Sequence, residues 1–172
     1  GVRPVGLRSA AASFVCLAIG IGAVIPVYSA PSESLSTRQI KQQLAAEDWQ
    51  LRRNALKAIA DQGKDPLRYG MDRQWMNSPH APIRYWLAHT LGNSRQAEAY
   101  RMLLQMVDDP HPNVACMAYY GLGGSGNRAA VDSIRGRLPD IRHWYVQWYA
   151  YKSLKRLGWV QQTSDMASGR SS

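Results

Sequence analysis

The chain is poor in cysteine, which limits how it can be stabilised and which groups it can carry. Only Cys16 and Cys116 occur among its 172 residues, and no CxxC or CxxCH pattern is present. An intramolecular disulfide framework and covalent haem attachment are therefore not expected. Lipid attachment at Cys16 is not expected either, because the preceding Ser-Phe-Val does not end in the required small residue.

Acidic residues are also scarce. The 12 Asp and Glu residues stand against 21 Lys and Arg, which gives a formal net charge of +9. The basic residues form no run of five or six, so nucleic acid is not expected as a partner. An acidic protein surface or an anionic lipid fits this charge balance.

No arrangement of residues indicates catalysis. Asp108 and Asp109 belong to a predicted turn, and the glycine-rich segment from Gly121 has no P-loop lysine. Cys116 and His89 as a nucleophile pair would need an orienting group that the sequence does not supply. We therefore predict no catalytic, cofactor-binding or metal-binding residue and no enzymatic activity.

What the sequence does contain is one pattern repeated four times. The copies read LRRNALKAIA, IRYWLAHTLG, VACMAYYGLG and VQWYAYKSLK, and they begin at the anchor residues Leu51, Ile83, Val114 and Val146. These anchors are 32, 31 and 32 residues apart. Helical spacing inside a unit of this length is typical of an α-solenoid, a fold usually built to hold other molecules.

The pattern predicts an all-α fold in residues 36–158, with eight helices in four antiparallel pairs and no strand. Ser36 and Gln39 form a predicted capping box at its start. Met71 and Trp75 are predicted to lie on one helix, the first of the second pair. The residues expected to be buried are Leu51, Ile59, Ile83, Leu91, Val114, Leu122, Val146, Ala150 and Leu154.

The repeat resembles the HEAT repeat in its short bacterial form, often called PBS-lyase HEAT-like. The third unit, LLQMVDDPHPNVACMAYYGLG, carries the resemblance best, with an apolar helix, an Asp-Asp-Pro-x-Pro turn, Val, Ala and Leu-Gly. The resemblance spans roughly residues 35–158. It implies helix pairs stacked into a curved rod with the second helices on its concave side. It implies no particular reaction, because the matching residues serve packing and turns.

The N-terminal region predicts export. Arg3 and Arg8 precede an uncharged apolar stretch from Ala10 to about Tyr28, so residues 1–30 are expected to be either a cleaved signal peptide or a helical transmembrane signal anchor. Residues 31–35 are a predicted linker, and residues 159–172 a predicted disordered tail. The expected location is the periplasmic side of a bacterial inner membrane, anchored or released.

Three of the four histidines occupy one position of the repeat. His80, His111 and His143 each lie three residues before an anchor, where the first unit has Asp48. Adjacent helices pack roughly 10 Å apart. Zinc–nitrogen bonds are only ~2.0–2.1 Å long, so equivalent histidines of adjacent units would be too far apart to bind one zinc ion. These residues are therefore predicted to be helix N-caps or turn residues, with no metal or other cofactor bound.

The positions opposite the predicted core are the candidate binding surface. At ~100° per residue, the second and sixth positions after each anchor point away from the core. Half of this outward row is aromatic or cysteine, Cys116 included, and none of it is acidic. Aromatic and basic residues are favoured interface anchors. Together with Trp144 from the aromatic last helix, the predicted partner-binding residues are Arg53, Lys57, Tyr85, His89, Tyr120, Trp144, Trp148 and Lys152.

These features predict a non-catalytic protein–protein interaction module. It would be an accessory or scaffold subunit of a larger membrane-associated envelope complex, with an electron-transfer or other energy-converting complex as one such context. Two alternatives remain open. The family resemblance suggests a bilin-lyase-like enzyme or chaperone, and the Trp and Tyr residues suggest a peripheral lipid-binding module.

Overall fold

The computed structural model describes residues 34–160, and in this range the chain is helical with no strand, which confirms the all-α prediction there. The predicted N-terminal helix and most of the predicted tail lie outside these residues. Within them, no helix has the length and apolar character needed to cross a membrane. The elements are α1 (Thr37–Leu44), α2 (Trp49–Asp61), η1 (Pro66–Tyr69), η2 (Arg73–Asn77), α3 (Ala81–Leu91), α4 (Ala97–Met106), α5 (Pro112–Ser125), α6 (Ala130–Arg137), η3 (Leu138–Asp140) and α7 (Trp144–Arg156), where η denotes a 3-10 helix.

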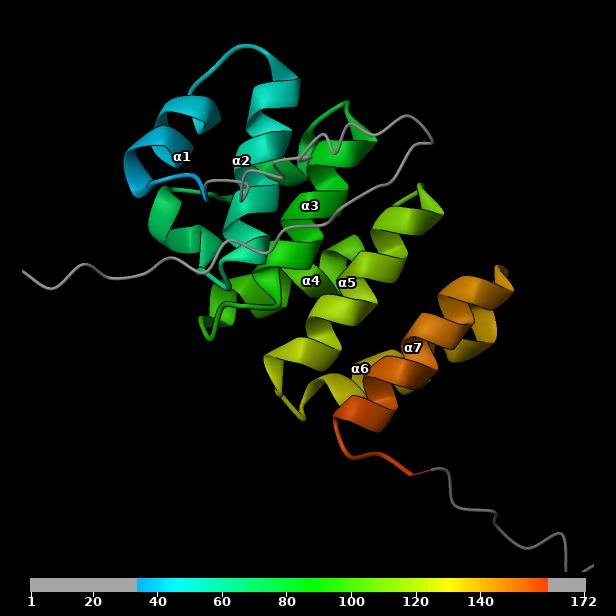
Figure 1. Cartoon of the computed structure of the whole chain (residues 1–172). Coiled ribbons are helices and arrows are strands. Elements are labelled where there is room, and N and C mark those ends of the chain that lie inside the picture. The colour runs from blue at the N-terminus through cyan, green and yellow to red at the C-terminus, as the bar shows by residue number, and fades with distance from the viewer. Residues whose placement is uncertain (1–33, 161–172) are drawn as a thin grey trace, which may run out of the picture. The chain divides into compact units, whose positions relative to one another are not determined.

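The four helices that carry the repeated pattern pack side by side in chain order. α2 contacts α3, α3 contacts α5, and α5 contacts α7 (Figure 1). The intervening elements pack against these helices: α1 on α2, η1 and η2 on α3, α4 on α5 and α6 on α7. We call α2, α3, α5 and α7 the second-helix layer.

These four helices begin in nearly the same way. His80, His111 and His143 are the N-cap residues of α3, α5 and α7, with φ/ψ angles of −90/107°, −89/113° and −88/118°. Asp48 holds the same place before α2, and its carboxylate accepts a hydrogen bond from the Gln50 amide at 2.8 Å. The histidines make no side-chain capping bond. The predicted N-cap position is confirmed, and in three of the four cases the backbone alone forms the cap.

The capping box at the start of α1 is confirmed. The Gln39 amide donates to Oγ of Ser36 at 3.3 Å, and the Ser36 amide donates to Oε1 of Gln39 at 2.8 Å. These reciprocal bonds satisfy donors that the first helical turn would otherwise leave unpaired.

The prediction of eight α-helices is wrong in the second pair, where two 3-10 helices replace the first α-helix. Gly70 ends η1 in the left-handed region at φ 79°, a conformation that costs glycine little and most residues more. The side chain of Asp72 then caps a new helix at the Gln74 amide, at 2.9 Å. Met71 lies in the break and is buried, so the predicted apolar contact survives without a continuous helix.

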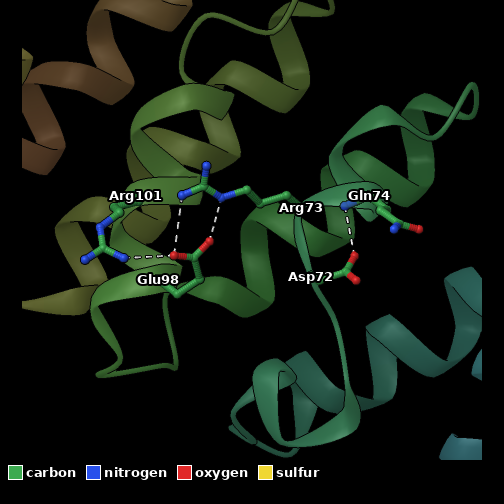
Figure 2. Close-up of polar contacts among 5 residues, drawn as sticks. All are labelled: Asp72, Arg73, Gln74, Glu98 and Arg101. Carbon is green, nitrogen blue, oxygen red and sulfur yellow. Dashed lines mark hydrogen bonds and ion pairs between the residues drawn. The ribbon is translucent and has the colours of Figure 1, made fainter.

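An ionic contact ties this irregular segment to the next pair. Nε of Arg73 in η2 lies 2.6 Å from Oε1 of Glu98 in α4, and Arg101 reaches the same carboxylate at 2.9 Å (Figure 2). All three side chains are substantially exposed, so the contact orients the segment more than it stabilises the fold.

The predicted core is confirmed except at its first anchor. Leu51 is 39% exposed, whereas the remaining predicted core residues are buried. It lies in the first turn of α2, and the described residues include no preceding helix pair to cover it. The buried residues are Ile59, Ile83, Leu91, Val114, Leu122, Val146, Ala150 and Leu154.

Glycine lets α5 approach its two neighbours closely. A Cβ on Gly121 would lie 2.9 Å from the Ala88 carbonyl oxygen of α3, and one on Gly123 would lie 3.0 Å from Cα of Ser153 in α7. Ser153 also donates its hydroxyl to the Tyr119 carbonyl of α5. The GLGGSG segment is therefore a packing surface in the middle of the second-helix layer.

A largely buried ion pair links α3 to the turn before α5. Arg84 donates Nε and Nη2 to the two carboxylate oxygens of Asp109 at 2.7 and 3.1 Å, and donates Nη1 to the Ser78 carbonyl at 2.7 Å. Only 14% of the Arg84 side chain and 8% of the Asp109 side chain are exposed. Asp109 also accepts from the His111 amide at 2.8 Å. The pair holds the turn in place.

Candidate partner-binding surface

The predicted binding residues lie along one layer of the fold, but not all are equally accessible. Arg53 and Lys57 come from α2, Tyr85 and His89 from α3, Tyr120 from α5, and Trp144, Trp148 and Lys152 from α7. Lys57, Tyr120, Trp144, Trp148 and Lys152 are exposed, and Arg53, Tyr85 and His89 are half-buried.

Cys116 does not belong to the accessible surface, contrary to its place in the outward row. It is only 3% exposed, because α5 is packed on both sides, by α3 and by α7. Burial raises the pKa of its thiol to about 11. At neutral pH the thiol is therefore protonated, and the structure gives no support to Cys116 as a nucleophile.

Side chains from all four second helices form one continuous series of ring contacts. Lys57 Nζ of α2 lies 5.6 Å from the Trp86 ring centroid of α3, and Trp86 lies 5.4 Å from the His89 ring. His89 stacks on Tyr120 of α5, with centroids 5.2 Å apart and planes 26° apart. The guanidinium of Arg156 in α7 lies 5.0 Å from the Tyr120 centroid. We call Lys57, Trp86, His89, Tyr120 and Arg156 the ladder.

The centre of the ladder is uncharged. Burial lowers the pKa of His89, an effect that the negative charge of Asp61 partly opposes. Its Nδ1 is buried and has no hydrogen-bond partner among the described residues. A neutral His89 between aromatic rings leaves positive charge at the two ends of the ladder, on Lys57 and Arg156.

A second group of aromatic side chains extends the surface along α7. Lys152 Nζ lies 4.2 Å from the Trp148 ring centroid, and Trp148 packs edge-on against Tyr149 at 5.2 Å. Trp148 is nevertheless 50% exposed, and Trp144, one turn earlier, is 77% exposed. We call Trp144, Trp148, Tyr149 and Lys152 the α7 cluster. The Trp144 and Trp148 rings are exposed to solvent, and Trp148 is already held in place by its contacts with Lys152 and Tyr149.

Two members of the ladder, Trp86 and Arg156, were missed by the sequence pattern. Arg156 is ten residues after its anchor, so extending the outward row by one further turn finds it. Trp86 follows Tyr85 on the same helix, and its ring contact with Lys57 depends on how α2 and α3 pack. No signal in the sequence gives that packing.

The charge of this surface is positive. Arg53, Lys57, Lys152 and Arg156 contribute four cations, and Asp61 is a neighbouring acid. Asp61 is already paired with Lys57 at 2.6 Å. The arrangement suits a partner that offers acidic or hydrogen-bond-accepting groups beside apolar ones.

Within residues 34–160, no group of three or more His, Cys, Asp and Glu side chains is placed to hold a metal ion. Comparison with models of known protein families finds no match, and comparison with curated proteins finds none either. No relative therefore supplies an activity for this chain, and the surface itself is the basis for assigning a function.

Proposed function

We propose that residues 36–158 form a short α-solenoid of HEAT-like helix pairs and act as a non-catalytic protein–protein interaction module. Two observations support the solenoid. Four helices that begin with matching N-cap geometry pack in chain order, and each has its own element against it. This is the nearest-neighbour contact pattern of stacked repeats.

The observation that carries the binding function is the exposed and partly fixed aromatic surface of the second-helix layer. Exposed Trp and Tyr residues are a solubility liability unless a partner covers them. They bind well when their side chains are ordered beforehand, because less conformational freedom is then lost on binding. The ladder and the cation–π contact of Trp148 with Lys152 provide this order.

The proposed setting is a membrane-associated complex of the bacterial envelope, in which this chain is an accessory subunit on the periplasmic side. The charged and apolar pattern of residues 1–30 supports export. Protein subunits of that complex are the proposed partners, and the second-helix layer would contact them.

The decisive experiment compares capture by the full chain with capture by Trp148→Ala. Tagged protein is purified from detergent-solubilised membranes of the source cells, and co-purified subunits are quantified by mass spectrometry. Truncating an interface anchor costs at least ~2 kcal/mol. At ~1.4 kcal/mol per tenfold change, that corresponds to roughly thirtyfold weaker binding.

Tyr151→Ala is the matched control, since Tyr151 is also an exposed aromatic residue of α7, at 41% exposure, and is not part of the ladder or the α7 cluster. It should leave capture unchanged, and both variants should keep the helical circular dichroism of the parent. Equal capture by Trp148→Ala and the parent would contradict the proposed function. If Trp148→Ala loses binding to protein-free vesicles and subunit capture is unchanged, the lipid-binding alternative is favoured.

A further inference from the structure

The molecule also has a groove lined by cationic side chains, none of which belongs to the ladder or the α7 cluster. It is open, has a volume of about 800 Å³, and lies between α1, η1 and the turns that follow α2 and α3. Four cationic side chains line it: Lys41 from α1, Lys64 after α2, Arg68 from η1 and Arg95 after α3. Each comes from a different segment, so the fold and not a local run of sequence gathers them.

These cations have little negative charge to balance them. Among the described residues, no acidic side chain forms an ion pair with any of the four. Asp65 is the acid in the groove lining, and each of its carboxylate oxygens accepts a hydrogen bond from a neutral amide. Oδ1 accepts from the Leu67 amide at 3.0 Å, and Oδ2 accepts from Nε2 of Gln96 at 2.9 Å.

Part of this charge has a structural use. Arg95 donates Nη1 to the Ser125 carbonyl at the end of α5, and Lys41 lies in the last turn of α1, where a cation favours the helix dipole. Lys64 lies 3.4 Å from the Thr37 hydroxyl, and Arg68 makes no hydrogen bond through its side chain to a described residue. Dipole effects explain single positions, but they do not require four cations to converge on one concave space.

We propose that this groove binds a ligand carrying two or more phosphate groups. A concave surface lined by one sign of charge concentrates counter-ions. Arginine forks match phosphate oxygens in pairs, and lysine adds point charges. The hydroxyl of Thr37 and the amide of Asn93 also line the groove and add neutral hydrogen-bonding groups. Four cations exceed what a single monovalent anion needs, which favours a diphosphate or a longer chain.

The test is calorimetric titration of the full chain with inorganic pyrophosphate. Binding at one site is expected, and Lys64→Gln with Arg68→Gln should weaken it at least about tenfold, which is the contribution of one hydrogen bond to a charged group. Arg142→Gln with Lys155→Gln is the matched control, because it removes two exposed charges elsewhere. The control should change affinity less than about twofold. Trp148→Ala should have no effect, so this test is independent of the proposed function.

Two further arms identify the source of the phosphate. Phosphatidylcholine vesicles with and without cardiolipin, whose headgroup carries two phosphates, show whether a lipid headgroup fills the groove, again by the difference between the two double variants. Poly-glutamate tests whether the groove binds carboxylate groups instead of phosphate groups. The proposal is overturned if neither pyrophosphate nor cardiolipin binds, if both double variants lose affinity equally, or if only poly-glutamate is sensitive to the groove variant.

Discussion

At the scale of single residues, the ion pair of Arg84 and Asp109 is the polar contact whose disruption should destabilise the fold most. Both side chains are mostly buried, and the two groups satisfy each other through two hydrogen bonds. The pair holds Arg84 charged, since the hydrogen bond with Asp109 raises its pKa. Removing one partner would leave the other charge buried without compensation.

Arg84→Ala should therefore lower the free energy of unfolding by about 3 kcal/mol, at the lower end for a broken buried pair. Urea denaturation followed by circular dichroism measures the change. Arg101→Ala serves as the control, because its pair with Glu98 is on the surface, with 59% of the Arg101 side chain exposed. It should cost less than about 1 kcal/mol. Similar losses in both variants would mean that Asp109 is solvated.

Burial of Cys116 gives a second residue-level prediction, on thiol reactivity. The pKa of about 11 in the folded chain compares with 9.0 for an unperturbed thiol, so folding should slow alkylation by about a hundredfold through the thiolate fraction alone. The native rate should continue to rise with pH up to about 11. Peptide mapping by mass spectrometry after iodoacetamide treatment, in buffer and in urea, separates Cys116 from Cys16. Rapid native alkylation of Cys116 at pH 7.5 would show that it is accessible.

At the scale of helices, the contact between α3 and α5 depends on glycine. A side chain on Gly121 would meet the Ala88 carbonyl oxygen at 2.9 Å and Cδ2 of Leu103 at 2.8 Å. A carbonyl inside a helix cannot move without shifting the helix, so the two helices would have to separate.

Gly121→Ala should consequently destabilise the chain by about 1–3 kcal/mol, the usual cost of overpacking. Gly136→Ala in α6 is the matched control, since a Cβ there would meet no atom within 4 Å. In that open position alanine should stabilise the helix by up to about 1 kcal/mol. Thermal unfolding of the two variants should move the melting temperature in opposite directions, and a neutral Gly121→Ala would show that the interface is loose.

The helix boundaries show what periodicity predicts and what it leaves out. The repeated apolar positions predicted the second-helix layer and its buried residues, because these depend on spacing along one helix. They gave no warning of η1 and η2, where Gly70 in the left-handed conformation and the Asp72 cap outweigh the apolar positions Met71 and Trp75. The exposure of Leu51 depends on what lies beside α2, which periodicity within α2 does not report.

At the scale of the whole molecule, the sequence predicted which face of the helices carries the candidate surface, but not which side chains contact one another there. The outward positions of α7 and Tyr120 of α5 are exposed, as helical geometry requires. The ladder could not be predicted, because each of its contacts between helices depends on the distance between neighbouring units. Cys116 was misplaced for the same reason: an outward position on one helix is buried when the helices on both sides lie close.

The final prediction concerns independent folding of the described part of the chain. The compact unit that contains the described helices begins at Ser34, and its core is made from those helices. Residues 34–160 expressed alone should therefore be helical by circular dichroism and should unfold in one cooperative transition. Capture of the partner subunits should also persist, because the ladder and the α7 cluster lie within this fragment. Helicity lost on truncation would show that residues outside 34–160 are needed for the fold, whereas retained helicity without capture would place part of the binding surface outside it.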